Sequence, residues 1–452
     1  MGKYKGINIL ALVQILFWYC IQAQSIVSDT TFNNLLRNCN NGWIAGDATY
    51  SIALPDGKTM WLFGDTFIGT VEADNSISPG AKMIRNSAVL MNKDSLQTLY
   101  TGSLDNPGDF IPTNYPDSIW YWPEHGMVEN DTLKIFLAKY KKNPAISSSW
   151  NFVHTGQYIA NFSYPEIQLL NIIPLSYADN NVLYGVRILY DSNYTYVYGR
   201  KEEDISGFNI PYPHVARFTQ NSNEKWSFFD GSSWSQEPEQ SAAINSFQVS
   251  QQYGVIKHNE IYILITQDIW LSPEIYSFTS SSPTGPWENK TLIYTTPIFW
   301  NNTFTYNAYP HPQFDTNNQL LISYNTNGDF WEIFKNVETY RPRFIRVPYE
   351  IIEYGFTNNV ASSNKDITNG ELNIYPNPAH HKITLQFDTK KECKAVFTIY
   401  NTSGQPKKQI TIHNTTSDNN SRAIDISVLP AGIYEGVLTS KSGIATKRIV
   451  KL

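Results

Sequence analysis

A strand–turn–strand pattern recurs along this chain and restricts its fold more than any other feature. Clear copies begin at Asp47, Glu124, Tyr184, Tyr253 and His311. In each copy a β-prone run is followed by a short polar turn and by a second run rich in Ile, Val, Tyr and Phe. Further strand candidates follow, such as residues 214–218 and 343–347. No amphipathic helix of useful length separates the copies, so the sequence predicts an all-β protein.

Five copies at intervals of about 60 to 75 residues are typical of repeat architectures closed around an axis. We therefore predict a five-bladed β-propeller over residues 24–356, with long loops inserted between its strands. A single β-sandwich is the alternative, but a sandwich of ordinary size does not need five similar hairpins.

The N-terminal residues have the composition of a secretory signal peptide. Lys3 and Lys5 precede an apolar run over residues 7–19, and Ala23 offers a small residue for cleavage. We predict a signal peptide over residues 1–23 and no stable membrane span. Cys20 lies inside this segment, which leaves only Cys39 and Cys393, far apart in sequence. The exported protein is therefore not held together by a disulfide scaffold.

Charge is unevenly distributed along the chain. The whole chain carries −6, whereas the segment from Leu372 onward has eleven Lys and Arg against five Asp and Glu. With two lysines in the signal peptide, the middle segment carries −14. An acidic, aromatic-rich segment excludes nucleic acid and anionic membrane as partners. Neutral polysaccharides or oligosaccharides fit it better, because aromatic faces stack on sugars, although most of these aromatics are expected to fill β-sheet cores.

The first hairpin brings two aspartates together. A strand is expected from Asp47 to Leu54, a turn over residues 55–58, and a second strand from Thr59 to Phe63. Antiparallel pairing then places Asp47 and Asp65 at the same edge of the sheet. Either residue alone could be a turn or capping aspartate, but two carboxylates at one edge are costly unless they are solvated, bonded or used.

Propeller geometry turns these positions into a candidate site on one face. Glycoside hydrolysis needs one protonated and one ionised carboxyl group, and clustered acids in an aromatic pocket have divergent pKa values. We predict Asp47 as base and Glu124 as acid, with Trp120, Tyr121, Trp122 and Pro123 raising the pKa of Glu124 by desolvation. Asp65 would tune Asp47 or orient water, and Asp268 would hold substrate or serve as the alternative acid. The predicted substrate-binding residues are Trp122, His125, Arg200, Asn307, His311 and Asn325.

Simpler interpretations of some of these residues stay open. Arg200 begins a charged run that is typical of a solvated loop, and His311 stands between Pro310 and Pro312 as a turn histidine would. The sequence contains no zinc-binding His/Cys spacing, no Gly-rich phosphate loop and no Gly-x-Ser-x-Gly elbow. Metalloprotease, nucleotide and esterase chemistry are therefore disfavoured. No cofactor is implied, the metal content is unknown, and calcium in the channel is left open.

An ordered set of motifs resembles secreted bacterial propellers long catalogued as domains of unknown function. The set comprises residues 43–52 and 61–67, Tyr-Val-Tyr-Gly at 196–199, His-Val-Ala-Arg at 214–217, Ser-Pro-Thr-Gly-Pro-Trp at 282–287 and residues 306–311 with 321–327. The resemblance covers about residues 38–348. A related branch contains endo-D-arabinanases, and the architecture is similar to family 43 glycoside hydrolases, whose blade-one base Asp47 matches. The resemblance implies an arabinanase-like glycoside hydrolase; a non-catalytic glycan-binding or structural surface propeller is the alternative.

The C-terminal segment differs in composition from the rest. Residues 357–371 form a polar linker. Tyr-Pro-Asn-Pro at 375–378, the Gly-Ile-Tyr strand at 432–434 and a basic terminal strand then resemble the sorting domain of type IX secretion cargo over residues 372–452. The resemblance implies a small β-sandwich that binds the type IX secretion machinery, and a protein exported to the surface or surroundings of a Gram-negative bacterium. An ordinary carbohydrate-binding sandwich is the alternative.

Overall fold

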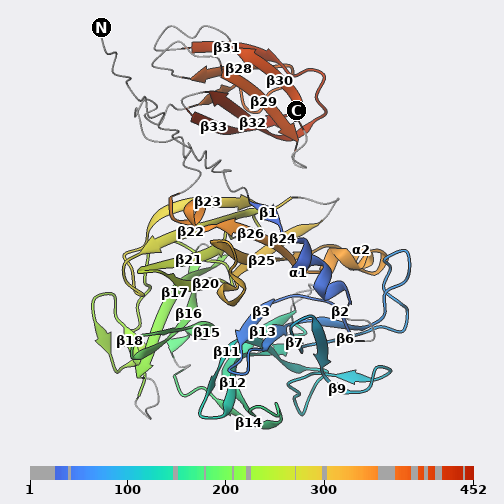
Figure 1. Cartoon of the computed structure of the whole chain (residues 1–452), viewed down its shortest axis with the longest axis vertical. Coiled ribbons are helices and arrows are strands. Elements are labelled where there is room, and N and C mark those ends of the chain that lie inside the picture. Colours follow the sequence, from blue (N-terminus) through green and yellow to red (C-terminus); the bar gives the residue numbers. More distant parts are fainter. Residues whose placement is uncertain are drawn as a thin grey trace, which may run out of the picture.

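The protein is built almost entirely from antiparallel β-sheets (Figure 1). The computed structural model describes residues 26–38, 42–145, 151–177, 180–205, 208–219, 225–269, 271–297, 303–354, 372–387, 395–401, 406–412, 420–440 and 443–452. Its three α-helices have six residues each: α1 (Thr30–Leu35), α2 (Phe330–Lys335) and α3 (Tyr349–Tyr354). The all-β prediction is confirmed.

Before the C-terminal segment, five sheets of four or five strands follow one another along the described part of the chain. The first contains β3 (Tyr50–Ala53), β4 (Thr59–Phe63), β7 (Ser87–Asn92) and β8 (Ser95–Leu99). The second contains β11 (Ile119–Glu129), β12 (Thr132–Lys142), β13 (Phe152–Ser163) and β14 (Leu169–Pro174). The third contains β15 (Leu183–Asp191), β16 (Tyr194–Ile205), β17 (Phe208–Thr219), β18 (Ser227–Phe229) and β19 (Trp234–Ser235). The fourth contains β20 (Gly254–His258), β21 (Ile261–Gln267), β22 (Glu274–Ser280) and β23 (Glu288–Thr295). The fifth contains β24 (Phe304–Pro310), β25 (Gln319–Asn327), β26 (Arg343–Pro348) and β1 (Val27–Ser28).

The first strands of these five sheets contact one another in a cycle. β3 contacts β11, β11 contacts β15, β15 contacts β20, and β20 contacts β24. The cycle returns to β3 through an edge-to-face contact between the rings of Tyr50 and Tyr309, with centroids 4.8 Å apart. The fifth sheet joins the two ends of this part of the chain, because β1 pairs with β26 and Asp29 forms an ion pair with Arg346 at 2.6 Å.

The opening hairpin forms as expected, but its first strand is shorter. β3 begins at Tyr50 rather than at Asp47, because Ala48 adopts a left-handed backbone with φ of 55° and turns the chain. The residues before this turn form a separate strand, β2 (Gly42–Gly46), which pairs with β5 (Thr66–Gly69); β6 (Lys82–Ile84) completes that small sheet. Asp47 and Asp65 thus lie where the chain passes between the small sheet and the first large one.

The expected strand from His311 is wrong. Pro312 cannot donate to a strand ladder, and Pro312–Phe314 form the short 3₁₀ helix η4 instead. The first strand of the fifth sheet is β24, which ends at Pro310. The remaining short elements are the 3₁₀ helices η1 (Leu36–Asn38), η3 (Pro238–Gln240) and η5 (Val337–Tyr340), and the strands β9 (Thr101–Gly102) and β10 (Pro107–Gly108).

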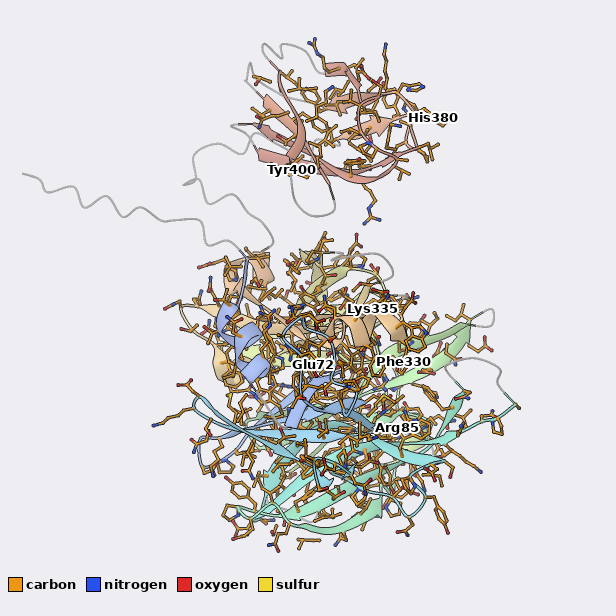
Figure 2. The ribbon with its side chains drawn as sticks, turned by 90° about the vertical axis from the view of Figure 1, so that its right-hand side faces the viewer. Glu72, Arg85, Phe330, Lys335, His380 and Tyr400 are labelled. Atoms are coloured by element: carbon orange, nitrogen blue, oxygen red, sulfur yellow. The ribbon has the colours of Figure 1, made fainter. Side chains whose placement is uncertain are left out.

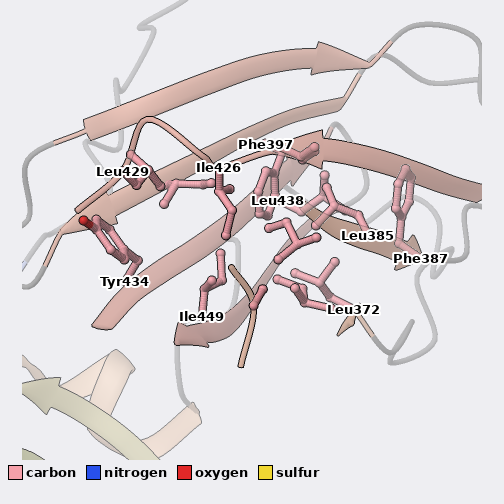
Figure 3. Packing of buried hydrophobic residues seen from close by; sticks show 14 of the residues in the cluster. Leu372, Leu385, Phe387, Phe397, Ile426, Leu429, Tyr434, Leu438 and Ile449 are labelled. Atoms are coloured by element: carbon pink, nitrogen blue, oxygen red, sulfur yellow. The ribbon is translucent and has the colours of Figure 1, made fainter. Parts of the chain in front are cut away.

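The C-terminal segment contains two sheets around a core of its own (Figure 3). One sheet contains β27 (Asn373–Tyr375), β28 (Lys382–Phe387) and β31 (Asn420–Asp425). The other contains β30 (Pro406–Ile412), β29 (Ala395–Asn401), β32 (Gly432–Ser440) and β33 (Gly443–Lys451). Leu385, Phe397 and Ile449 from both sheets are fully buried in this core. The predicted signal peptide, the whole predicted linker, and Cys20, Cys39 and Cys393 lie outside the described residues.

Candidate active site

Asp47 lies between β2 and β3 and accepts hydrogen bonds from two tyrosines. The Tyr306 hydroxyl donates to its Oδ2 at 2.7 Å, and the Tyr340 hydroxyl also hydrogen-bonds to this carboxyl group. The backbone holds the residue against Gly64, whose N–H donates to the Asp47 carbonyl at 2.9 Å. A Cβ at position 64 would lie 2.8 Å from Asp47 Oδ1, so the approach of this carboxyl group requires glycine there.

Asp65 follows β4 and accepts hydrogen bonds from nitrogen donors. Arg85 donates to its Oδ2 at 3.1 Å, and the indole N–H of Trp122 donates to its Oδ1 at 3.0 Å. Arg85, labelled in Figure 2, also lies over the Trp120 ring, with its guanidinium carbon 4.4 Å from the ring centroid. The Asp65 side chain keeps 20% of its surface exposed, so a ligand can reach it.

The two aspartates interact electrostatically, and their environments differ. Burial, reinforced by the charge of Asp65, raises the pKa of Asp47 to about 7 against the two tyrosine hydrogen bonds. Burial also raises the pKa of Asp65, but the cation of Arg85 and the Trp122 N–H oppose that rise. Because Asp65 alone has a cationic donor, its carboxylate is stabilised relative to that of Asp47. The two groups therefore differ in the environment of their protons, and Asp47 can act as an acid near neutral pH.

Glu124 does not have the environment that its predicted role requires. It lies in β11 at a bulge, is 5% exposed, and accepts hydrogen bonds from the Tyr50 hydroxyl and from Arg200, whose Nη1 is 3.2 Å away. The sequence interpretation considered only desolvation by neighbouring aromatic residues. A buried cation in direct contact favours the ionised carboxylate instead. Arg200, predicted to bind substrate and with a solvated loop as the alternative, lies in β16 and is the buried partner of Glu124.

Trp122 forms part of an aromatic wall beside Asp65. Its ring lies 4.5 Å from that of Tyr140 and 5.0 Å from that of Phe152, while Trp120 packs against both Trp122 and Phe152. Trp122 therefore both contributes to this aromatic surface and donates a hydrogen bond to Asp65.

The two predicted histidines are buried within the fold. His311 has no exposed surface and its ring nitrogens bond to Ser51 at 2.6 Å and to Ser323 at 2.8 Å. His125 is 7% exposed, and its nitrogens face the Ser51 carbonyl and the Ile188 N–H. Burial holds the pKa of both imidazoles well below the ordinary value. These contacts hold both rings inside the fold, and their predicted role in substrate binding stays a prediction.

The other predicted residues have different surroundings. Asn325 is 1% exposed and accepts a hydrogen bond from Thr49 at 2.8 Å, while Asn307 has a left-handed backbone and accepts from the N–H of Gln252 at 3.3 Å. Both belong to the strands that carry Tyr306 or pair with it. Asp268 instead bonds to the N–H of Ile269 within its own loop. Within the described part of the chain, no recorded contact joins Asp268 to the other acids.

Sequence reasoning missed the residues that surround the aspartates. Tyr306, Tyr340 and Arg85 decide where the proton resides, and they come from elements far apart in the chain. Only a weak signal marks them, namely isolated polar residues next to apolar strands. Among the described residues, no group of three or more His, Cys, Asp or Glu side chains could hold a metal ion. None of the described helices has the length and hydropathy that crossing a bilayer requires.

Comparisons with known proteins place these observations in a family. Residues 29–364 match the family described as Domain of unknown function (DUF5005), and residues 373–452 match the Secretion system C-terminal sorting domain. No curated protein matches the chain.

Solved structures are similar to this chain to different degrees, all at low sequence identity. A Bacteroides ovatus protein, provisionally described as a hydrolase, is 20% identical over 71% of this chain and 90% of its own, with a TM-score of 0.61. A protein of unknown function from Dyadobacter fermentans is 10% identical over 78% and 92%, with a TM-score of 0.42. The GH43_1 enzyme of Xanthomonas citri complexed with xylotriose is 13% identical over 67% and 86%, with a TM-score of 0.39. The chain belongs to the DUF5005 family and carries a type IX secretion sorting domain at its C-terminus.

Proposed function

We propose that this protein is an exported glycoside hydrolase whose reacting groups are Asp47 and Asp65. In this interpretation the five sheets are the blades of a five-bladed propeller, spanning residues 24–356. The residues from 372 onward form a small β-sandwich that serves as the sorting domain. The sorting domain directs the protein to the cell surface or the surroundings of a Gram-negative bacterium. A signal peptide over residues 1–23 and a linker over 357–371 are part of the same proposal.

The observation that carries the proposal is a pair of interacting carboxyl groups with different donors: Asp47 accepts from tyrosine hydroxyls, and Asp65 accepts from Arg85 and Trp122. Asp47, with a pKa of about 7, can donate a proton near neutral pH, while Arg85 and Trp122 oppose the rise that burial causes in the pKa of Asp65. Pairs of titratable groups whose environments separate their pKa values mark acid and base assignments. This pair replaces the predicted pair of Asp47 and Glu124, because Glu124 is buried against Arg200.

The chemistry of the pair follows from these states. Asp47 gives its proton to the glycosidic oxygen as the bond to the anomeric carbon breaks. Asp65 attacks that carbon and forms a glycosyl ester, which is the covalent intermediate of a retaining mechanism. Water then adds to the anomeric carbon, Asp47 takes one proton from it, and the Asp65 carboxylate leaves.

The surroundings of the pair favour a neutral carbohydrate substrate. Trp122, Tyr140 and Phe152 present an aromatic surface beside Asp65, and sugar rings stack on such surfaces. The acidic character of the chain before the sorting domain disfavours polyanionic substrates. Neutral arabinans, arabinogalactans and xylans are the classes to examine, and a calcium ion in the channel is not needed for the steps above.

The test measures release of reducing ends from arabinan, arabinogalactan and xylan. We expect Asp47→Asn and Asp65→Asn each to lower kcat by at least three orders of magnitude, as for groups that act in the transition state. Asp268→Asn is the matched control, because its carboxylate bonds within its own loop, and it should keep activity. Full activity in Asp65→Asn would refute the proposed pair. Binding of these glycans without turnover by the parent protein would instead support the non-catalytic alternative.

A further inference from the structure

Gln252 is a buried side chain whose hydrogen-bonding groups have no protein partner. It lies two residues before the start of β20 at Gly254 and is 2% exposed. Among the residues that the structure describes, neither its Oε1 nor its Nε2 has a hydrogen-bond partner. A buried amide without partners is costly, so this group is unusual in a folded protein.

Asn325 in β25 has the same property at one atom. Its Oδ1 accepts from the Thr49 hydroxyl at 2.8 Å. Its Nδ2 is buried and has no partner within the described ranges. Asn325 is paired with Tyr306 in the register of β24 and β25, and Tyr306 donates to Asp47. Asn325 therefore lies opposite Tyr306, the residue that donates a hydrogen bond to the proposed acid Asp47.

Gln252 lies between the proposed reacting pair and the Glu124 ion pair. Its backbone N–H donates to Asn307, the residue next to Tyr306. Gln251, the residue before Gln252, accepts a hydrogen bond from Nε of Arg200 at 2.5 Å, and Arg200 forms an ion pair with Glu124. Gln252 is thus linked through Asn307 to the strand that carries Tyr306, and through Gln251 to the ion pair of Arg200 and Glu124.

The chemistry of these two amides and of the nearby carboxyl groups restricts which ligand the amides can bind. An apolar ligand would leave the amides unpaired, and an anion would lie near Asp47, Asp65 and Glu124. A carboxamide presents a donor and an acceptor side by side, and a hydroxyl group can act as either. Two adjacent hydroxyl groups on one ring can therefore pair with both atoms of Gln252 at once, while a further ring oxygen accepts from Asn325.

We propose that Gln252 and Asn325 form a recognition site for adjacent hydroxyl groups of a neutral sugar ring, and that they position this ring beside Asp47. The inference rests on the proposed function for the identity of the ligand. It goes beyond that function in assigning the specificity of the site to two amides, neither of which acts on the reacting bond.

The test separates a role in ligand binding from a role in folding. Gln252→Met keeps the length of the side chain and removes its hydrogen-bonding atoms. Because these atoms bond to no described protein group, the Tm of Gln252→Met should equal or exceed that of the parent protein. Its affinity for arabinohexaose or xylohexaose, measured by calorimetry in the full-length Asp47→Asn protein to prevent turnover, should fall at least tenfold.

Gln267→Met is the matched control. Gln267 is also a fully buried glutamine, but its Nε2 donates to the Ser272 carbonyl at 2.8 Å and to Thr305 at 2.9 Å. The control should lower Tm and leave the affinity for the hexasaccharide unchanged. An O-methylated hexasaccharide should bind the parent no better than it binds Gln252→Met.

The remaining outcomes each decide the question. Unchanged affinity with a raised Tm would mean that Gln252 pairs with water only, and would overturn the inference. Equal losses of affinity in Gln252→Met and Gln267→Met would overturn it as well, as would a parent protein that binds neither hexasaccharide. Binding that depends on Gln252 in a parent that releases no reducing ends would refute hydrolysis and leave the recognition site standing.

Discussion

Replacing Asp47 by asparagine should stabilise the folded protein, and the gain should depend on pH. The unfolded chain releases the Asp47 proton above its ordinary pKa of 3.8, whereas the folded protein keeps it until about pH 7. Between these values folding takes up a proton, so the free energy of unfolding decreases as the pH rises. Asparagine cannot ionise and escapes this loss.

The size of the gain follows from the shift in pKa. One pKa unit corresponds to about 1.4 kcal/mol, and the rise from 3.8 to about 7 therefore corresponds to about 4 kcal/mol. Asp47→Asn should match the parent most closely near pH 4, gain progressively up to pH 7, and show a constant advantage of at most about 4 kcal/mol above that pH. This is a large fraction of the stability of an ordinary domain. The cost is the expected consequence of holding a carboxyl group in a reactive state.

Urea unfolding followed by tryptophan fluorescence from pH 4 to 8.5 provides the assay. The chain has no tryptophan after residue 331, so the signal does not report on the sorting domain. Asp230→Asn is a control of opposite sign, because N–H and hydroxyl donors of Ser232 and Ser233 lower the pKa of that carboxyl. Its loss of stability should be present at neutral pH and disappear in acid. A difference between Asp47→Asn and the parent that does not change with pH would refute the reasoning.

Three further predictions follow from the site and the sorting domain. Gly64→Ala places a Cβ 2.8 Å from Asp47 Oδ1 and should lower kcat at least tenfold in the reducing-end assay, whereas Gly80→Ala, with no atom closer than 4.0 Å, should not. Glu124→Gln leaves the buried Arg200 without its counter-charge and should reduce the free energy of unfolding, measured in urea, by about 3 to 5 kcal/mol. An effect smaller than about 1 kcal/mol would mean that the ion pair is solvated. Deleting the sorting domain should retain the protein in the periplasm, as fractionation and immunoblotting would show, and surface exposure of the truncated form would contradict its role.

Much of the fold could be predicted because the hairpins are local. β-branched and aromatic runs separated by polar turns predicted β11 with β12, β15 with β16, and β20 with β21. The pairing of β1 with β26 could not be predicted, since it joins Val27 to Arg346 and leaves no local pattern. The prediction of a strand from His311 was wrong because it ignored Pro312, which has no N–H to donate to a neighbouring strand.

The candidate site was predictable only in part, for a similar reason. Asp47 and Asp65 lie close in sequence, so the hairpin alone brings them together. Their ionisation states depend on partners from other sheets, such as Tyr306, which is 259 residues from Asp47. Glu124 was assigned a neutral state from the aromatic residues beside it, but its charge is determined by Arg200, 76 residues further along the chain.

The kind of donor that each of the three carboxyl groups receives accounts for their different states. Glu124 receives a buried guanidinium and a hydroxyl, Asp65 receives a partly exposed guanidinium and an indole N–H, and Asp47 receives hydroxyl groups alone. A cationic donor stabilises the carboxylate, whereas a tyrosine hydroxyl can also accept a hydrogen bond from the protonated acid. Only Asp47 can therefore gain and lose a proton without depriving a guanidinium of its counter-charge. The arrangement of neutral and cationic donors thus distinguishes Asp47 from the other two carboxyl groups as the acid of the proposed site.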